Sequence, residues 1–321
     1  MKRIWSILLV IIAGVFLVNM SSNQKDSVKN NLEDGWAFYN PDQLGISERS
    51  RIDIGQKAEN YHCANEDTIV AVVDTGIDMS CKLLQNRIIV GWDFYNDDNT
   101  IYDDYLYDYH GTYIANMIAK VSSNTKILSV KFMEGTNGCV EDSVSAIRYA
   151  IDHGAKIINC SWNTSEDNKQ LYDMISDHQE ILFVCAAGNI YQDLDQNELY
   201  PATYTLDNII SVMAINQQGE VYMQSGYGKN NVDIAAPGEY VRVILPSDDV
   251  DYVDGTSVAA AFVSSAAAML LSYNEDLSPM EIKQLLIDSA NKMTTLSNYC
   301  VSGGCIDIGM ALQLSKGGRV K

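Results

Sequence analysis

Short apolar runs alternate with stretches of helical periodicity along most of the chain. The apolar runs are rich in Val and Ile and are typical of buried strands; they cover residues 68–73, 126–132, 156–160, 181–185, 209–215 and 232–235. Helical patterns separate or follow them at 110–120, 140–153, 167–178, 257–272 and 279–290. This alternation predicts an α/β fold of three layers, in which helices cover both faces of a mostly parallel sheet.

The first 60 residues do not follow this pattern. Lys2 and Arg3 precede an apolar run from Ile4 to Met20, after which the chain turns polar. A positive start before an apolar stretch is typical of export, so we expect residues 1–22 to be a signal peptide or an N-terminal membrane anchor. We interpret residues 23–60 as a short stalk and 61–321 as the folded domain, which would lie outside the cytoplasm.

Composition and charge exclude one large class of partner. The 321 residues, 47% of them apolar, are enough for a large core. The net charge is −20, and a phosphate backbone would be repelled, so we expect no nucleic-acid partner. The acidic excess favours solubility and would also attract a basic peptide.

The seven cysteines form no C-x-x-C pair, so neither a zinc ribbon nor a thioredoxin motif is supported. Cys300 and Cys305 are close enough in sequence to close a small loop by a disulfide. Cys160 and Cys185 lie in apolar runs, and we expect them to be buried free thiols.

Three motifs place reactive side chains at the ends of predicted strands or the starts of helices. Asp74 ends the strand in VAVVDTGID, His110 begins a helix beside Gly111, and Ser257 begins another in GTSVAAAF. Ligands bind beyond the carboxyl ends of the strands in a parallel sheet. Histidine is the side chain best suited to proton transfer near neutral pH. Taken alone, Ser257 is more simply explained as a helix cap and Asp74 as a turn residue.

Asn189, in CAAGN, offers an amide donor at the end of another strand and is a candidate for stabilising an oxyanion. An ordinary Gly-Asn turn is the alternative explanation for this motif. The remaining histidines have plainer structural explanations, in a loop, at a helix end and on a polar helix: His62, His153 and His178.

Asp74, His110 and Ser257 occur in the order Asp, His, Ser, and with their surroundings they resemble the subtilisin family of serine peptidases. The matching stretches run in family order from residue 66 to 290: VAVVDTGID, YHGTYIA, NCSWN, AAGN, YPATY, SGYG, VDIAAPG and GTSVAAAFV. The resemblance implies a subtilisin-like fold and peptide hydrolysis through an acyl-enzyme. It implies that Ser257 is the nucleophile, His110 its general base and Asp74 the carboxylate that orients His110.

The same resemblance assigns the oxyanion hole and the substrate-binding residues. Asn189 matches the side chain of the oxyanion hole, beside the backbone N–H of Ser257. Ser161-Trp162-Asn163 matches the strand that binds the substrate backbone and forms one wall of the first specificity pocket. Residues 186–188, with Gly188 at their end, and the stretch before Tyr200-Pro201 match its other walls.

The substrate-binding strand departs from the family pattern. The usual sequence at 161–163 is Ser-Leu-Gly, so Trp162 and Asn163 are unusual there. Asn163 in place of glycine should narrow or reshape the pocket. We therefore expect a restricted processing endopeptidase, for example one that removes a leader or propeptide.

This chemistry requires no cofactor. Whether the chain binds a metal ion is left open by the sequence. The segment between Asn116 and Lys126 is short, so we expect the family's usual tight calcium loop to be absent. Calcium would still have a run of carboxylates available, although such runs are usually just solvated: Asp93, Asp97, Asp98, Asp103, Asp104 and Asp108.

Two rival functions remain to be compared. A catalytically inactive relative that binds peptides would suit the altered pocket, but the retention of all four catalytic positions disfavours it. An α/β esterase or lipase would need a G-x-S-x-G elbow and the order Ser, Asp, His, and neither is present. The favoured hypothesis is an extracytoplasmic serine endopeptidase, a monomer that acts on a peptide or protein and contacts a membrane through its N-terminal segment.

Overall fold

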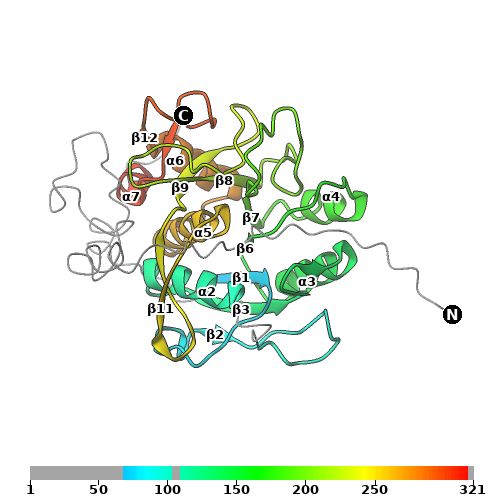
Figure 1. Cartoon of the computed structure of the whole chain (residues 1–321). Helices are drawn as coiled ribbons and strands as arrows, with labels where there is room; N and C mark the ends of the chain where they lie inside the picture. The colour runs from blue at the N-terminus through cyan, green and yellow to red at the C-terminus, as the bar shows by residue number, and fades with distance from the viewer. Residues whose placement is uncertain (1–67, 103–108, 317–321) are drawn as a thin grey trace, which may run out of the picture.

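A central sheet dominates the computed structural model, which describes residues 68–102 and 109–316 (Figure 1). Within those residues the sheet has nine strands: β1 (Ile69–Asp74), β2 (Ile88–Ile89), β3 (Lys126–Lys131), β6 (Ile157–Cys160), β7 (Leu182–Ala186), β8 (Ile209–Ile215), β9 (Ile234–Pro237), β12 (Asn291–Lys292) and β13 (Gly304–Cys305). Their order is β12-β13-β9-β8-β7-β6-β1-β3-β2. All neighbours pair in parallel except β12 and β13, which are antiparallel. The predicted, mostly parallel sheet is confirmed.

Helices cover both faces of this sheet: α2 (His110–Val121), α3 (Val140–Asp152), α4 (Lys169–Ser176), α5 (Thr256–Tyr273), α6 (Pro279–Ser289) and α7 (Ile308–Lys316). Figure 1 shows α3 and α4 on one side of the sheet and the other four on the opposite side. Successive side chains of β1 point alternately to the two faces of the sheet, as strand geometry requires. Val70 and Val72 belong to the core under α2 and α5, whereas Ala71 and Val73 belong to the core under α3 and α4. The three-layer α/β fold is therefore confirmed.

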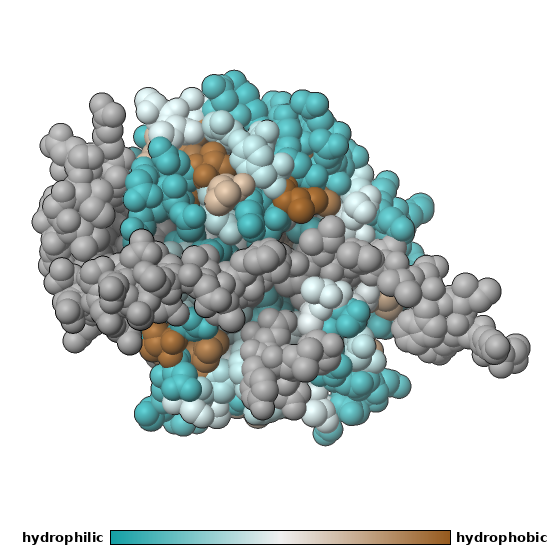
Figure 2. Space-filling view, viewed as in Figure 1, coloured by the Kyte–Doolittle hydropathy of each residue, from teal (hydrophilic) through white to brown (hydrophobic). Residues whose placement is uncertain are grey.

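The short elements complete the domain outside the main sheet. They are two hairpins, β4–β5 (Met133–Glu134 and Asn137–Gly138) and β10–β11 (Val241–Ile244 and Val250–Val253), and two 3₁₀ turns (Lys82–Leu84 and Pro246–Asp248). The described surface in Figure 2 is mostly hydrophilic, with separate apolar spots. This agrees with the strongly acidic composition.

Helix α5 explains the run of small residues after Ser257. It passes through the domain beside β6, β7, β8 and β9, and nearly all of its side chains are buried. Alanine and serine let a helix approach neighbouring elements closely from every side. It is the one described helix long and apolar enough to cross a membrane, but 89% of that stretch is buried inside the domain. It is a core helix, and the expected signal or anchor (1–22) and stalk (23–60) lie outside the described residues.

Helix α6 begins at the capping box that the sequence predicts. The Ser278 hydroxyl accepts from the Glu281 N–H at 3.3 Å, and the Glu281 carboxylate accepts from the Ser278 N–H at 2.9 Å. We expect Ser278→Ala to lower the free energy of unfolding by about 1 kcal/mol, because the Glu281 N–H loses its intramolecular acceptor. Urea unfolding of the full chain measures this. Met280→Ala, an exposed change in the same turn, is the control, and equal stabilities of the two variants would contradict the prediction.

The described cysteines are all free thiols. Cys160 and Cys185 are buried and unbonded, as predicted. The loop that Cys300 and Cys305 would close is not formed. Cys300 instead lies 3.4 Å from the Ser302 hydroxyl, while Cys305 is held in β13, which pairs with β9.

Candidate active site

The end of β1 and the start of α2 bring Asp74 and His110 together. His110 Nδ1 lies 2.7 Å from Asp74 Oδ1, and both side chains are completely buried. The same carboxylate oxygen accepts from the Thr75 N–H at 2.8 Å. Because a carboxylate only accepts, Nδ1 carries the proton in this bond. That tautomer leaves the lone pair of the neutral imidazole on Nε2, which can then accept a proton.

Gly111 allows α2 to start so close to β1. A Cβ atom at this position would lie 2.2 Å from the Gly76 carbonyl oxygen and 3.3 Å from Asp74 Cβ. The Gly111 N–H also donates to the Thr75 hydroxyl at 3.0 Å. Any larger residue beside His110 would therefore push the imidazole away from its carboxylate.

Ser257 is the second residue of α5, the helix that packs against α2. Its hydroxyl donates to the Ser161 carbonyl at 3.2 Å, and the Ser161 hydroxyl donates to the Ser257 carbonyl at 3.1 Å. These two bonds fix the start of α5 against the end of β6. Proton transfer from Ser257 to His110 requires its hydroxyl hydrogen to leave the Ser161 carbonyl, and catalytic hydrogen bonds often form only when substrate is bound.

Asn189 is held with its amide in one orientation. Its Oδ1 accepts from both the N–H and the hydroxyl of Thr256, each at 2.9 Å. Its Nδ2 is buried and has no hydrogen-bond partner among the residues that the structure describes. A buried donor left without a partner costs about 1–3 kcal/mol. The site therefore presents a fixed N–H group that an incoming oxyanion can satisfy, beside the backbone N–H groups that begin α5.

Thr256 is a site residue that the sequence did not single out. Besides its bonds to Asn189, its hydroxyl accepts from the Gly188 N–H at 3.1 Å. It thus joins the start of α5 to the segment that follows β7. The signal was present in the sequence, since Thr256 directly precedes Ser257, but a threonine before a helix reads first as a cap.

The predicted substrate residues lie at the ends of two neighbouring strands. Ser161, Trp162 and Asn163 follow β6, and Gly188 follows β7. The Trp162 ring points into the core. Its Nε1 donates to the Val73 carbonyl at 3.1 Å and it packs against Phe132 in the core. Only the backbone of Trp162 is available to a peptide.

The other histidines make local contacts. His153 and His178 lie at the ends of α3 and α4. In each, the distance from Nδ1 to the carbonyl oxygen of the residue four positions earlier is 2.7 Å. His62 lies outside the described residues. Of the three described histidines, only His110 contacts a buried carboxylate.

The candidate calcium ligands do not form a metal site within the described part of the chain, where no three acidic, histidine or cysteine residues cluster suitably. Asp93 instead pairs with Lys131 at 3.2 Å and accepts from the Tyr95 and Asn96 N–H groups. Burial lowers the pKa of Lys131, but Asp93 and Glu134 more than offset this and raise it. Asp103, Asp104 and Asp108 lie outside the described residues.

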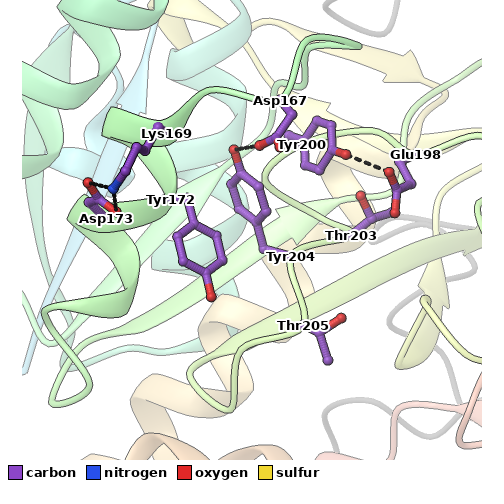
Figure 3. Close-up of a pocket in the computed structure, with 9 residues that line it drawn as sticks. All are labelled: Asp167, Lys169, Tyr172, Asp173, Glu198, Tyr200, Thr203, Tyr204 and Thr205. Atoms are coloured by element: carbon purple, nitrogen blue, oxygen red, sulfur yellow. Dashed lines mark hydrogen bonds and ion pairs between the residues drawn. The ribbon is translucent and has the colours of Figure 1, made fainter.

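A polar pocket of about 550 Å³ adjoins the segment around Tyr200 (Figure 3). The Tyr200 hydroxyl donates to Glu198 at 2.6 Å, and the Tyr204 hydroxyl donates to Asp167 at 3.2 Å. Burial, together with Glu198, raises the pKa of Tyr200 to about 12, so its hydroxyl stays protonated. Tyr200 also pairs with Thr164 through two backbone hydrogen bonds of 2.8 Å. The pocket is thus connected to the substrate strand by this pairing.

Known proteins resemble this chain in sequence and in fold. Residues 65–303 match the model of the Subtilase family. The "Thermophilic serine proteinase" of Bacillus sp. (strain AK1) is 31% identical over 243 residues, which are 72% of this chain and 58% of that protein. The "Cell wall-associated protease" of Bacillus subtilis (strain 168) is 31% identical over 252 residues, 74% of this chain and 27% of that protein.

The "Major intracellular serine protease" of Bacillus subtilis (strain 168) is 35% identical over 224 residues, 64% of this chain and 69% of that protein. The chain therefore spans less than two thirds of two of these three relatives. Among solved structures, "Structural basis of subtilase cytotoxin SubAB assembly" matches with a TM-score of 0.72 and 23% identity, over 88% of this chain and 96% of the other. That likeness concerns the fold alone.

Proposed function

Because the chain belongs to the subtilase family, we propose that it is a serine endopeptidase that hydrolyses peptide bonds through an acyl-enzyme on Ser257. The observation that carries this proposal is the buried pair of Asp74 and His110, 2.7 Å apart, at the start of the helix that packs against α5. A buried carboxylate bonded to Nδ1 prepares an imidazole to act as a base at Nε2.

In the first half of the reaction, Ser257 Oγ attacks the peptide carbonyl carbon and His110 Nε2 takes its proton. Asp74 stabilises the imidazolium that forms, since the two groups are already in contact and shielded from water. The carbonyl oxygen becomes an oxyanion that accepts from Asn189 Nδ2 and the Ser257 N–H. His110 then protonates the leaving amine as the C–N bond breaks.

In the second half, water attacks the acyl-enzyme while His110 Nε2 accepts a proton from it. The same donors hold the second oxyanion, and His110 returns the proton to Ser257 Oγ as the ester bond breaks. Ser161, Asn163, Gly188 and the backbone of Trp162 would hold the peptide during both halves. None of these steps needs a cofactor.

We expect Asn189→Ala to lower kcat by about 10²–10³, the loss known for the corresponding residue of subtilisin rather than a value from this structure. KM should change little, because the donor acts on charge that develops only in the transition state. Steady-state kinetics on a peptide substrate measure both constants. Asn298→Ala, an exposed change, is the control. A variant that changes KM alone would contradict a role in the oxyanion hole.

The narrower proposal is a processing peptidase that acts outside the cytoplasm, attached through its N-terminal segment or secreted. The positive, then apolar, start of the sequence supports the location. Relatives include one named as cell wall-associated and one named as intracellular. Asn163 and the buried Trp162, at positions that form the substrate strand, support a restricted range of substrates.

Digestion of denatured proteins tests the activity and its range together. Mass spectrometry of the products should identify a few cleavage sites that are absent with Ser257→Ala. Cleavage at many unrelated sequences would contradict the restricted role but not the peptidase activity. No cleavage of any protein or peptide by a folded chain would favour the inactive, peptide-binding alternative.

A further inference from the structure

The segments after β6 and β7 lie side by side, and a substrate side chain would have to enter between them. Cys160 and Cys185 are register partners at the ends of these parallel strands. Residues 161–163 and 186–188 continue directly from them. Gly188, with φ of 87°, has no side chain of its own to fill the space between the segments.

Two side chains of the protein, those of Leu199 and Asn163, lie against Gly188. A Cβ atom built on Gly188 would lie 2.6 Å from Leu199 Cδ1 and 3.2 Å from Asn163 Nδ2. Carbon atoms in ordinary contact are about 3.5–4.0 Å apart, so even one added carbon is crowded here. Leu199 and Asn163 are each only 2% exposed. The side of Gly188 that faces Asn163 is therefore occupied rather than open.

Leu199 is held in this position by its neighbours. Successive side chains of an extended segment point to opposite sides. Glu198 and Tyr200 line the pocket of Figure 3 and bond to each other at 2.6 Å. Leu199 belongs to the core on the α5 side of the sheet, whereas Tyr200 belongs to the opposite core. The two Thr164–Tyr200 backbone bonds anchor the segment.

Gly188 is equally fixed. Its N–H donates to the Thr256 hydroxyl at 3.1 Å, and its carbonyl accepts from the Gly226 N–H at 2.7 Å. A Cβ on Gly226 would lie 2.1 Å from the Ala187 carbonyl oxygen, so this neighbouring segment also packs tightly. Neither wall can withdraw from the other without breaking hydrogen bonds.

We propose that Leu199 and Asn163 close the first specificity pocket, so that this peptidase cleaves after small residues, glycine or alanine. The inference rests on the proposed function and names its substrate class. A larger side chain before the cut would have to displace a buried leucine. One methylene group too many in a pocket changes kcat/KM by about 10–200-fold. The side chain of phenylalanine exceeds that of alanine by a whole phenyl ring. Leu199 is thus a specificity-determining residue, 36 positions away in sequence from Asn163.

The test uses the full chain and the substrates succinyl-Ala-Ala-Pro-X-p-nitroanilide, with X as Gly, Ala, Leu or Phe. We expect wild-type kcat/KM to be at least about 10²-fold higher for Ala than for Phe. In the double variant Leu199→Ala, Asn163→Gly, this ratio should fall at least about 10-fold, through a gain on Leu and Phe. Asn163→Gly alone, a change outside the main core cluster, should give part of the same gain if Leu199→Ala does not fold.

Leu194→Ala is the matched control, because Leu194 is as buried as Leu199, belongs to the same core and lies five positions earlier. It should keep the wild-type preference for alanine. A wild-type preference for Leu or Phe, or equal preferences in wild type and the double variant, would overturn the inference. A fluorophosphonate label on Ser257 in the same samples distinguishes a failure of the specificity inference from a failure of the proposed peptidase function. Labelled enzyme with the wrong preference overturns only the inference, whereas unlabelled, folded enzyme overturns the proposed function with it.

Discussion

Ser257→Ala is expected to lower kcat by about 10⁶, the largest effect of any single change considered for this chain. The size is the one known for subtilisin, where loss of the nucleophile costs as much as loss of the whole triad. The physical reason here is that alanine leaves His110 and Asp74 in place but removes the oxygen that forms the acyl-enzyme. Initial rates at high enzyme concentration measure the residual activity.

The matched control for Ser257→Ala is Ser265→Ala in the same helix. Ser265 is completely buried and donates to the Ala261 carbonyl within α5 at 2.7 Å. Its loss changes the packing of α5 without touching the site, so activity should stay within a few-fold of wild type. Residual activity of Ser257→Ala above about one per cent of wild type would contradict a nucleophilic role.

Asp74→Asn is expected to lower kcat by about 10⁴ while the fold is kept. The amide has the shape of the carboxylate, and its oxygen can still accept from the Thr75 N–H. It bears no negative charge to stabilise the imidazolium that forms when His110 accepts the proton of Ser257. Steady-state kinetics and a near-UV circular dichroism spectrum together separate lost catalysis from lost structure.

Asp78→Asn controls for the removal of a buried carboxylate near the same strand end. Asp78 is 3% exposed, and its carboxylate accepts from the Ser80 N–H rather than from a histidine. This variant should lose stability before it loses turnover. Equal kinetic losses for Asp74→Asn and Asp78→Asn would contradict a specific role for Asp74.

Most of the main sheet could be predicted because its strands are buried on both faces. The run 209–215 is apolar except for Ser211, and it matches β8 residue for residue. The edge strands β2 and β12, and β13 beside β12, have two residues each, too few to carry a pattern. The helical pattern at 167–178 corresponds to α4, which starts only at Lys169 because the Asn168 side chain caps the helix by accepting from the Gln170 and Leu171 N–H groups.

In the site, residues that belong to local motifs could be predicted, whereas side chains positioned by distant parts of the chain could not. Asp74, His110 and Ser257 could be named because each belongs to a local motif at the boundary of an element. The direction of the Trp162 ring could not be predicted, since it depends on the Val73 carbonyl and Phe132 from other elements. Leu199 ends the stretch before Tyr200 that the resemblance assigns to a pocket wall, but the sequence does not show that its side chain reaches Gly188. Only the pairing of Tyr200 with Thr164 brings it to Gly188.

The most direct test of a working Asp74–His110–Ser257 site is covalent labelling of the folded full chain with a fluorophosphonate, followed by mass spectrometry of its peptides. The probe reacts with an activated serine and needs no knowledge of the substrate. We expect one adduct, on Ser257, that is absent from Ser257→Ala and His110→Ala. Folded wild-type protein without an adduct, or with its adduct on another serine, would contradict the proposed mechanism.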